Sequence, residues 1–421
     1  MVDIIKTIAV ILGIYFLVID LKRYIGGNRN IIVFLQCVCF FFYYIPMICD
    51  LVYSRPNYES WSWGFIKSHK DPTTEIIYCV VISYITYMFH YFQKKHTVSN
   101  LFDDLKMNSS KISFLLLFLL SIIIIYVIMQ IDGESLKSIL TYNMRHQRRE
   151  NDTIVKNIAF AIIGLALVYI CIEPKVRVLI LKIIYMFPIL TFACLLNGKR
   201  TSVFMCVVGL LMILIVKHVI KKKVTLILIV GISLSLLAIY VSFYNDSVTE
   251  EADAYLSYRI NYGRDDTLKM TIYSELYDDG ILEYRGQTLL YYLTFYIPRN
   301  VWNTKPYPYA TYLTAYLCNL GEVRNLGWNM TTSIFDEFLS NFGWLGLLLV
   351  PFIINKCIKG IMKRNKGILG MSIVFLGLLD VVMLIAVQAS AFLILYLLLI
   401  LLIIVYDRKE KKFKKRSEGI E

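Results

Sequence analysis

Arginine and lysine side chains that could bind anions recur in the polar segments of this chain. The long polar segment 244–333 carries Arg264, Arg285, Arg299 and Lys305, and the short turn 197–200 ends in Lys199-Arg200. The planar guanidinium of arginine binds phosphate oxygens in a bidentate manner and stays charged at a partly dry site. Such residue types could therefore hold an anionic group.

Two adjacent acidic residues, Asp336 and Glu337, lie where this polar segment enters an apolar run. A carboxylate in this position could accept a proton from a reacting hydroxyl, or it could orient an essential arginine. The simpler alternative is that the acids stabilise the first turn of a helix, with Thr331, Thr332 or Ser333 as its cap. The sequence leaves both interpretations open.

The elements that position these residues are expected to be membrane helices. Hydrophobic residues make up 57% of the 421 residues and the mean hydropathy is +0.60. Apolar runs fall near 2–20, 31–52, 74–92, 111–129, 153–172, 177–196, 201–216, 223–243, 334–354, 367–385 and 387–406. Most are long enough to cross a hydrocarbon core of about 30 Å. This pattern excludes a soluble globular domain and predicts an all-α, polytopic transmembrane bundle of about eleven helices, with 1–421 as a single membrane domain.

Basic residues predict the orientation of the bundle. They concentrate in alternate short loops and in the tail after residue 407, which the positive-inside rule places in the cytoplasm. The N-terminus is then outside and the C-terminus inside, and segments 53–73, 130–152 and 244–333 face the exterior. Two cations in the short exterior turn at Lys199-Arg200 run against that bias, which favours a functional role for them.

The long exterior loop 244–333 is predicted to contain two or three short helices. Segment 266–283 has Leu268, Ile272 and Leu276 at helical spacing, while 289–297 and 309–320 are dense in aromatic and aliphatic residues. We expect these helices to lie at the lipid interface and to cap the bundle.

Two elements of the chain carry a resemblance to a known family. The first is Pro298-Arg299 followed by Lys305-Pro306, and the second is Glu337 followed by Asn341-Phe342-Gly343. Together they resemble the oligosaccharide repeat-unit polymerases of bacterial surface polysaccharides, the O-antigen and capsule polymerases of the Wzy family. The recognisable motifs cover about residues 195–350. The chain departs from the family pattern at Lys199-Arg200-Thr201, where relatives commonly have Arg-Gly, and at Asp336, where a small residue is usual.

The resemblance implies a glycosyltransferase that joins undecaprenyl-pyrophosphate-linked oligosaccharides on the outer face of the bacterial inner membrane, with inversion and without a cofactor. It implies contact with the lipid bilayer and, as protein partners, a flippase and a chain-length regulator of the same pathway, with no nucleic acid. Catalytic roles would fall to Arg200, Arg264, Arg299 and Glu337, and substrate-binding roles to Lys199, Arg285, Trp302, Lys305 and Asp336.

Other functions remain open. An O-antigen-ligase-like enzyme has a similar bundle and an arginine-rich exterior site, whereas a flippase or transporter would need a cationic cavity or an inverted repeat. A structural subunit of an export complex would give Arg299 no individual importance. The adjacent pairs Asp265-Asp266 and Asp278-Asp279 are weak indications of a metal site, and motifs for nucleotide binding are not evident.

Overall fold

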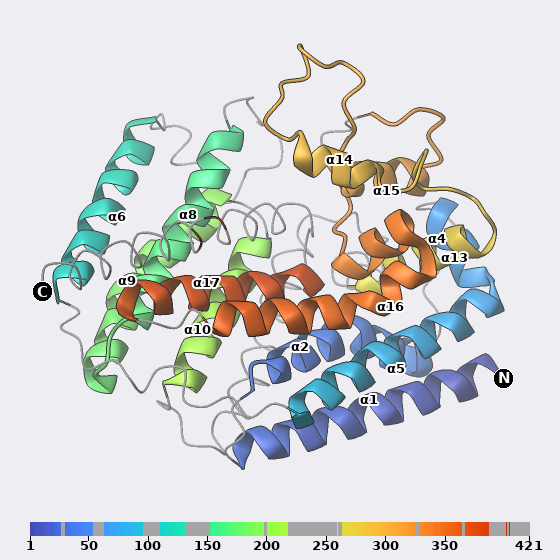
Figure 1. Cartoon of the computed structure of the whole chain (residues 1–421), viewed down its shortest axis with the longest axis horizontal. Helices are drawn as coiled ribbons and strands as arrows, with labels where there is room; N and C mark the ends of the chain where they lie inside the picture. The colour runs from blue at the N-terminus through green and yellow to red at the C-terminus, as the bar shows by residue number, and fades with distance from the viewer. Residues whose placement is uncertain are drawn as a thin grey trace, which may run out of the picture. The chain divides into compact units, whose positions relative to one another are not determined.

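The computed structural model describes residues 1–26, 30–53, 63–95, 110–130, 152–197, 200–217, 259, 263–324, 328–363, 367–386, 401 and 404. Regular structure in these ranges is helical, with no strand (Figure 1). Each predicted apolar run is helical except 223–243 and most of 387–406, which lie outside the described residues. The chain forms two compact units that interleave along the sequence, one of 1–99, 230–359 and 380–401, the other of 100–229, 360–379 and 402–421.

The first unit begins with three apolar segments that pack together. These are α1 (Val2–Ile25), the continuous rod α2 (Ile32–Cys39), η1 (Phe40–Tyr44) and α3 (Ile45–Tyr53), and α5 (Pro72–Lys95). The widened π-turn η1 ends two residues before Pro46, which has no N–H to donate. Tyr44 and Thr86 join the rod to α5 through a hydroxyl contact of 2.8 Å.

The polar segment of the first unit folds onto these helices. It contains α13 (Arg264–Leu276), α14 (Gln287–Leu293) and α15 (Tyr309–Leu317). Helix α13 packs against α4 (Trp63–Lys70) and α5, and α15 packs against α4. Almost all side chains of α13 and α15 are buried within the unit.

Helix α4 lies in the predicted loop 53–73 and was not expected from the sequence. Its contacts with α13 and α15 bring the loops 53–73 and 244–333 to the same side of the unit. Gly64 permits this packing, because a Cβ there would lie 2.5 Å from Sδ of Met270 and 3.1 Å from Cα of Leu317. The described parts of these two segments therefore pack together within the first unit.

Helix α16 (Ile334–Met362) is the long apolar helix that follows the polar segment. A capping box starts it: the Ser333 N–H donates to Asp336 Oδ2 at 2.8 Å, and the Asp336 N–H donates to Ser333 Oγ at 3.4 Å. The helix breaks at Gly343, whose φ of 63° lies in the left-handed region. Beyond the break, the Tyr84 hydroxyl donates to the carbonyl of Leu348 at 2.9 Å and fixes α16 on α5.

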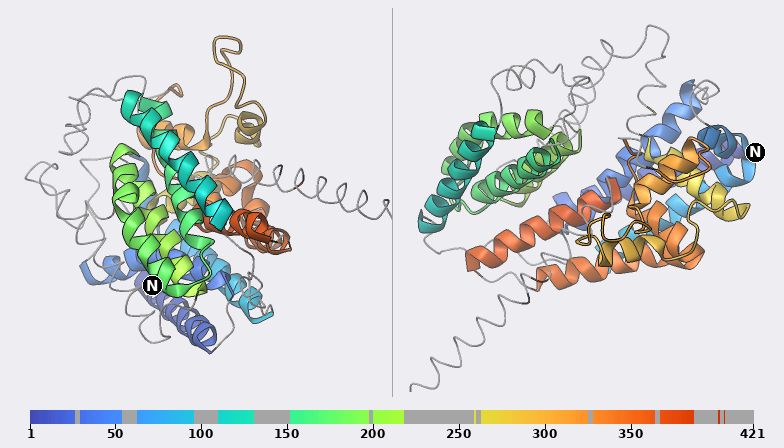
Figure 2. Two further views of the ribbon diagram at one scale, coloured as in Figure 1. Left: turned by 90° about the vertical axis from the view of Figure 1, so that its left-hand side faces the viewer. Right: turned by 90° about the horizontal axis from the view of Figure 1, so that it is seen from above.

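The second unit contains α6 (Ser110–Gln130), α8 (Asp152–Cys171), α9 (Val176–Asn197), α10 (Arg200–Val216) and the first part of α17 (Gly367–Ala386), shown from two further sides in Figure 2. Helices α8 and α9 form a hairpin. Across its turn, Lys182 Nζ lies 2.9 Å from Glu173 Oε2, so the cation within an apolar helix has a counter-charge.

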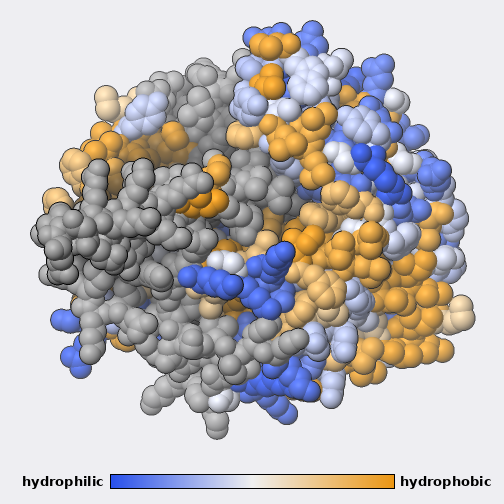
Figure 3. Space-filling view, in the orientation of Figure 1, coloured by the Kyte–Doolittle hydropathy of each residue, from blue (hydrophilic) through white to orange (hydrophobic). Residues whose placement is uncertain are grey.

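Among the residues that the structure describes, five segments are long and apolar enough to cross a membrane: Val2–Ile25, Ile32–Tyr53, Pro72–Lys94, Val176–Asn197 and Ile334–Met362. In Figure 3 hydrophobic residues gather over the region of α5 and α16. Exposed apolar side chains of these helices and of α1 include Ile11, Val80 and Leu345. Exposed apolar side chains of this kind are expected where helices face lipid. The chain is thus a helical protein with the spans of a membrane protein.

Candidate functional site

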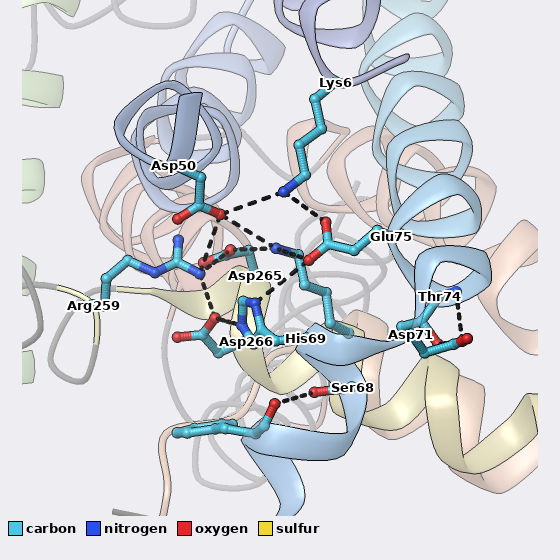
Figure 4. A network of polar contacts seen from close by, with 12 residues as sticks. Lys6, Asp50, Ser68, His69, Asp71, Thr74, Glu75, Arg259, Asp265 and Asp266 are labelled. Atoms are coloured by element: carbon cyan, nitrogen blue, oxygen red, sulfur yellow. Dashed lines mark hydrogen bonds and ion pairs between the residues drawn. The ribbon is translucent and has the colours of Figure 1, made fainter. Parts of the chain in front are cut away.

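Eight ionisable side chains meet inside the first unit (Figure 4). They come from α1, α3, α4, α5, α13 and the residue at 259, and they are Lys6, Asp50, His69, Glu75, Arg259, Asp265, Asp266 and Lys269. All eight are buried. We call this set the buried charge network.

Lys269 of α13 is the central cation of the network. Its Nζ lies 3.1 Å from Glu75 Oε1, 3.2 Å from Asp265 Oδ2 and 3.7 Å from Asp50 Oδ2. The spacing of four residues places Asp265 and Lys269 on one face of α13. Burial by itself would lower the pKa of Lys269, but the surrounding carboxylates raise it above its usual value.

Arg259 supplies the second cation for α13. One guanidinium nitrogen, Nη2, contacts Asp265 Oδ2 at 2.6 Å and makes a very short contact with Asp266 Oδ1. Burial would raise both aspartate pKa values, and it prevails at Asp265; at Asp266 the charges of Arg259, His69 and Lys269 hold the pKa below its usual value. The two neighbouring acids are therefore not equivalent.

Lys6 completes the network from α1. Its Nζ lies 2.9 Å from Glu75 Oε2 and 3.7 Å from Asp50 Oδ2. The carboxylates thus face cations and not one another, and the described residues contain no group of His, Cys, Asp and Glu with the arrangement of a metal site. The pair Asp265-Asp266, a weak metal signal in the sequence, contacts Arg259, Lys269 and His69 of α4. Sequence analysis missed the network, although Lys6 and Asp50 inside apolar runs were a usable signal.

The Pro-bounded element 298–306 forms a second, different cationic arrangement. Arg299 donates from Nη1 to the carbonyl of Lys305 at 2.8 Å and from Nη2 to the carbonyl of Pro306 at 2.9 Å. Lys305 Nζ donates in turn to the carbonyls of Phe295 and Ile297 at 2.9 and 2.8 Å. We call this the Arg299–Lys305 turn.

Aromatic rings support the cations of the Arg299–Lys305 turn. The Arg299 guanidinium lies 3.5 Å from the ring centre of Tyr307, and Lys305 Nζ lies 5.4 Å from that of Tyr291. Desolvation lowers the pKa of Lys305, and the neighbouring Arg299 lowers it further. Within the part of the chain that the structure describes, neither cation forms an ion pair with a carboxylate. Two neighbouring, unneutralised cations favour binding of an anion.

The other predicted cations are placed differently. Arg264 is buried, and its Nε donates to the carbonyl of Ala386 at 2.9 Å. Arg285 binds Glu275 at 2.6 Å beside Gly343. Arg200 begins α10 in the second unit, its side chain lies outside the description, and Lys199 lies outside the described residues.

Glu337 is buried beneath α14. Its Oε1 accepts hydrogen bonds from the Thr288 hydroxyl at 2.8 Å and the Tyr292 hydroxyl at 2.6 Å, and Asn341 Nδ2 donates to Thr288 Oγ1 at 2.7 Å. The residue beside Tyr292 is Tyr291, the ring that faces Lys305. Glu337 thus fixes the helix that supports the Arg299–Lys305 turn, while Asp336 serves the cap of α16.

Several apolar side chains are exposed around the Arg299–Lys305 turn, beside the exposed polar residues Asn300, Asn303 and Thr304. In Figure 1 the segment between α14 and α15 projects from these helices. Leu293 and Tyr296 are each 70% exposed and Val301 is 75% exposed. Trp302 is half-buried, and its Nε1 donates to Thr304 Oγ1 at 2.9 Å. Exposed apolar and aromatic side chains next to cations are typical of segments that contact lipid and its headgroups.

Comparisons of the chain with family models, with curated proteins and with solved structures find no match.

Proposed function

We propose that this protein is a membrane glycosyltransferase that polymerises lipid-linked oligosaccharide repeat units at the outer face of a bacterial inner membrane. The proposal combines the sequence resemblance with one structural observation. Arg299 and Lys305 are neighbouring cations that are held in place by backbone carbonyls and are not neutralised by a carboxylate among the described residues. They lie among exposed apolar side chains. This combination suits a lipid whose headgroup is a pyrophosphate.

The cations have hydrogen-bonding capacity left for such a ligand. A guanidinium has more N–H donors than the two that Arg299 gives to the carbonyls of Lys305 and Pro306, and an ammonium has more than the two that Lys305 uses. Because the carbonyls fix both side chains, little conformational entropy is lost on binding. Arg299 is half-exposed and Lys305 is buried, so Arg299 is the principal contact.

In the proposed reaction, a hydroxyl of one lipid-linked unit attacks the anomeric carbon of another. The bond from that carbon to the pyrophosphate oxygen breaks, the undecaprenyl pyrophosphate leaves, and the hydroxyl proton passes to a base. Arg299 stabilises the negative charge that develops on the leaving pyrophosphate, which is an electrostatic contribution to the rate. Glu337 acts as a positioning residue through Thr288 and Tyr292 of α14.

The test compares surface glycan from a strain that lacks the gene after complementation with wild type, Arg299→Ala or Arg324→Ala. Arg324 is an exposed arginine of the same polar segment, outside the turn, and serves as the matched control. We expect wild type and Arg324→Ala to restore a ladder of polymer, and Arg299→Ala to leave single repeat units at equal protein level. Full-length polymer left unattached in the deletion strain would indicate a ligase. Repeat units confined to the cytoplasmic leaflet would indicate a flippase.

A binding measurement tests the role of Arg299 separately. Loss of a charged hydrogen-bond donor reduces the binding free energy by about 1.5–3 kcal/mol, which corresponds to roughly ten- to hundredfold weaker binding. Undecaprenyl pyrophosphate should therefore bind the purified Arg299→Ala protein at least about tenfold more weakly than it binds wild type or Arg324→Ala. Equal affinity in all three proteins would remove Arg299 from the site.

A further inference from the structure

Two cysteines, Cys194 and Cys206, bring their sulfur atoms into contact between helices of the second unit. Cys194 lies in the last turn of α9 and Cys206 in the second turn of α10, and the two helices pack together. Their Sγ atoms lie 3.4 Å apart. Both residues are free thiols in the structure, so the contact is an S–H···S interaction between two helices.

A disulfide between these two residues requires little movement. Its S–S bond is about 2.05 Å long, so the two sulfur atoms have to approach by about 1.4 Å. Rotation about the Cα–Cβ bonds moves each Sγ without moving the backbone. Only residues 198 and 199 connect α9 to α10, so the helices are neighbours in the sequence as well as in space. The two helices can therefore keep their places while the bond forms.

The two thiols differ in exposure and in partners. Cys194 is half-buried, whereas Cys206 is buried, with an exposed fraction of 6%. The hydroxyl of Ser202, in the first turn of α10, is a second hydrogen-bond partner of the Cys194 sulfur. A hydroxyl donor stabilises a thiolate, which is the nucleophile in thiol–disulfide exchange. Cys194 is thus the thiol that an external reagent reaches first, and Cys206 is shielded from it.

Cys194 lies near the polar end of its helix. Asn197 ends α9, and at a rise of 1.5 Å per residue Cys194 is about 4.5 Å along the axis from that end. The turn 197–200 that follows is predicted from the distribution of basic residues to face the exterior. Disulfides form and persist in oxidising, extracytoplasmic compartments and are rare in the cytoplasm. The position of Cys194 therefore gives external disulfides access to it.

We propose that Cys194 and Cys206 are an attacking and a resolving cysteine, which form a disulfide between α9 and α10. The Cys194 thiolate attacks an external disulfide, R–S–S–R, which gives a mixed disulfide and releases one RS⁻. The Cys206 sulfur then attacks Sγ of Cys194, which forms the Cys194–Cys206 bond and releases the second RS⁻. The two cysteine protons pass to the released thiolates. Two cysteine thiols are thereby oxidised, and one external disulfide is reduced to two RSH molecules.

The bond closes a covalent ring around the turn 197–200. It joins the two ends of segment 194–206, which includes Lys199 and Arg200, so it limits how far α9 and α10 can separate at this turn. The proposal concerns the second unit alone and does not depend on the proposed polymerase activity.

The experiment maps disulfides in the full chain, reduced and then freed of reductant in nanodiscs. Oxidised glutathione is the external disulfide, N-ethylmaleimide blocks the remaining thiols, and trypsin digestion is followed by mass spectrometry without reduction. Trypsin cleaves after lysine and arginine, so Cys194 lies on peptide 183–199 and Cys206 on peptide 201–217. In wild type we expect these two peptides to be joined, with a mass two hydrogen atoms below their sum.

Three variants separate the roles of the two thiols. Cys206→Ser should lose the joined peptides and retain glutathione on Cys194, because the resolving thiol is gone. Cys194→Ser should lose the joined peptides and leave Cys206 without glutathione, because Cys206 is buried. Cys37→Ser is the matched control, since Cys37 is another half-buried cysteine of an apolar helix, and it should give the joined peptides at the yield of wild type.

Several results would overturn the proposal. Wild type in which both thiols stay unmodified, or in which glutathione remains on Cys194, would show that Cys206 does not resolve the mixed disulfide. Joined peptides that occur only in a covalent dimer on a non-reducing gel would place the bond between two chains. Glutathione on Cys206 in Cys194→Ser would contradict the assignment of Cys194 as the attacking thiol.

Discussion

The buried charge network makes its sharpest prediction at Lys269. Replacement of Lys269 by methionine keeps the apolar stem and removes the ammonium that lies 3.1–3.7 Å from Glu75, Asp265 and Asp50. All of these groups are buried. Removal of one partner from a buried ion pair costs about 3–5 kcal/mol, because an uncompensated charge remains inside the protein. We therefore expect Lys269→Met to lower the free energy of unfolding by an amount in this range.

The exposed ion pair of the same polar segment is the control. Glu275→Gln removes the partner of Arg285, whose side chain is 58% exposed, and pairs of this kind contribute about 0–1 kcal/mol. Unfolding of the detergent-solubilised full chain by denaturant, followed by tryptophan fluorescence, gives both differences from the shift in midpoint. Equal effects of Lys269→Met and Glu275→Gln would refute the assignment of the network as the anchor of α13.

A double-mutant cycle separates the charge effect from lost packing. Asp265→Asn removes one of the acids that Lys269→Met leaves uncompensated, and burial already raises the pKa of Asp265. The double variant should therefore be more stable than the sum of the two single changes predicts, by about 1–3 kcal/mol. Strict additivity would mean that Lys269 acts through its apolar stem and not through its charge.

Two further predictions concern the break in α16 and the loss of stability at low pH. Gly343→Ala should lower the free energy of unfolding by about 1–2 kcal/mol, because the residue has a φ of 63° and a Cβ there would lie 2.8 Å from Nη1 of Arg285. The measurement is the midpoint of denaturant unfolding, which should fall. Gly360→Ala is the control, because a Cβ at Gly360 meets no atom within 4 Å. Asp266 has a pKa below its usual value, so its contribution to stability is complete above the unfolded-state pKa of about 3.9 and is lost as the pH falls through the lower folded-state pKa. Wild type should thus lose more stability than Asp266→Asn below about pH 4 in an acid titration of the unfolding midpoint, and equal losses would contradict the assigned shift.

The fold was predictable from the sequence where a single segment carries its own signal. Apolar runs of membrane length predicted α1, α5 and α9 within a few residues, and helical spacing of Leu268 and Ile272 predicted α13. Helix α4 gave no such signal, because the segment Trp63–Lys70 is short and depends on its packing against Met270 and Leu317. A helix stabilised mainly by tertiary contacts is difficult to predict from local pattern.

The candidate site was predictable only where neighbouring residues in the sequence form it. The prolines at 298 and 306 enclose Arg299 and Lys305, so their proximity followed from the sequence, but their carbonyl partners did not. The buried charge network joins residues almost two hundred positions apart, such as His69 and Asp266, and no local pattern relates them. Asp336 was one of two neighbouring acids with open roles, and the structure places it in the cap of α16.

The distribution of counter-charges is the strongest link between this structure and a function. Arg259 and Lys269 are buried against carboxylates, and Arg285 has Glu275, so these cations are neutralised within the fold. Arg299 and Lys305 are oriented only by carbonyl dipoles and aromatic rings among the described residues, although the pKa of Lys305 is already lowered by its surroundings. Two adjacent cations without a counter-charge are costly unless an anion binds to them. The proposal that an external anion binds at the Arg299–Lys305 turn rests on this contrast between the neutralised cations of the fold and these two.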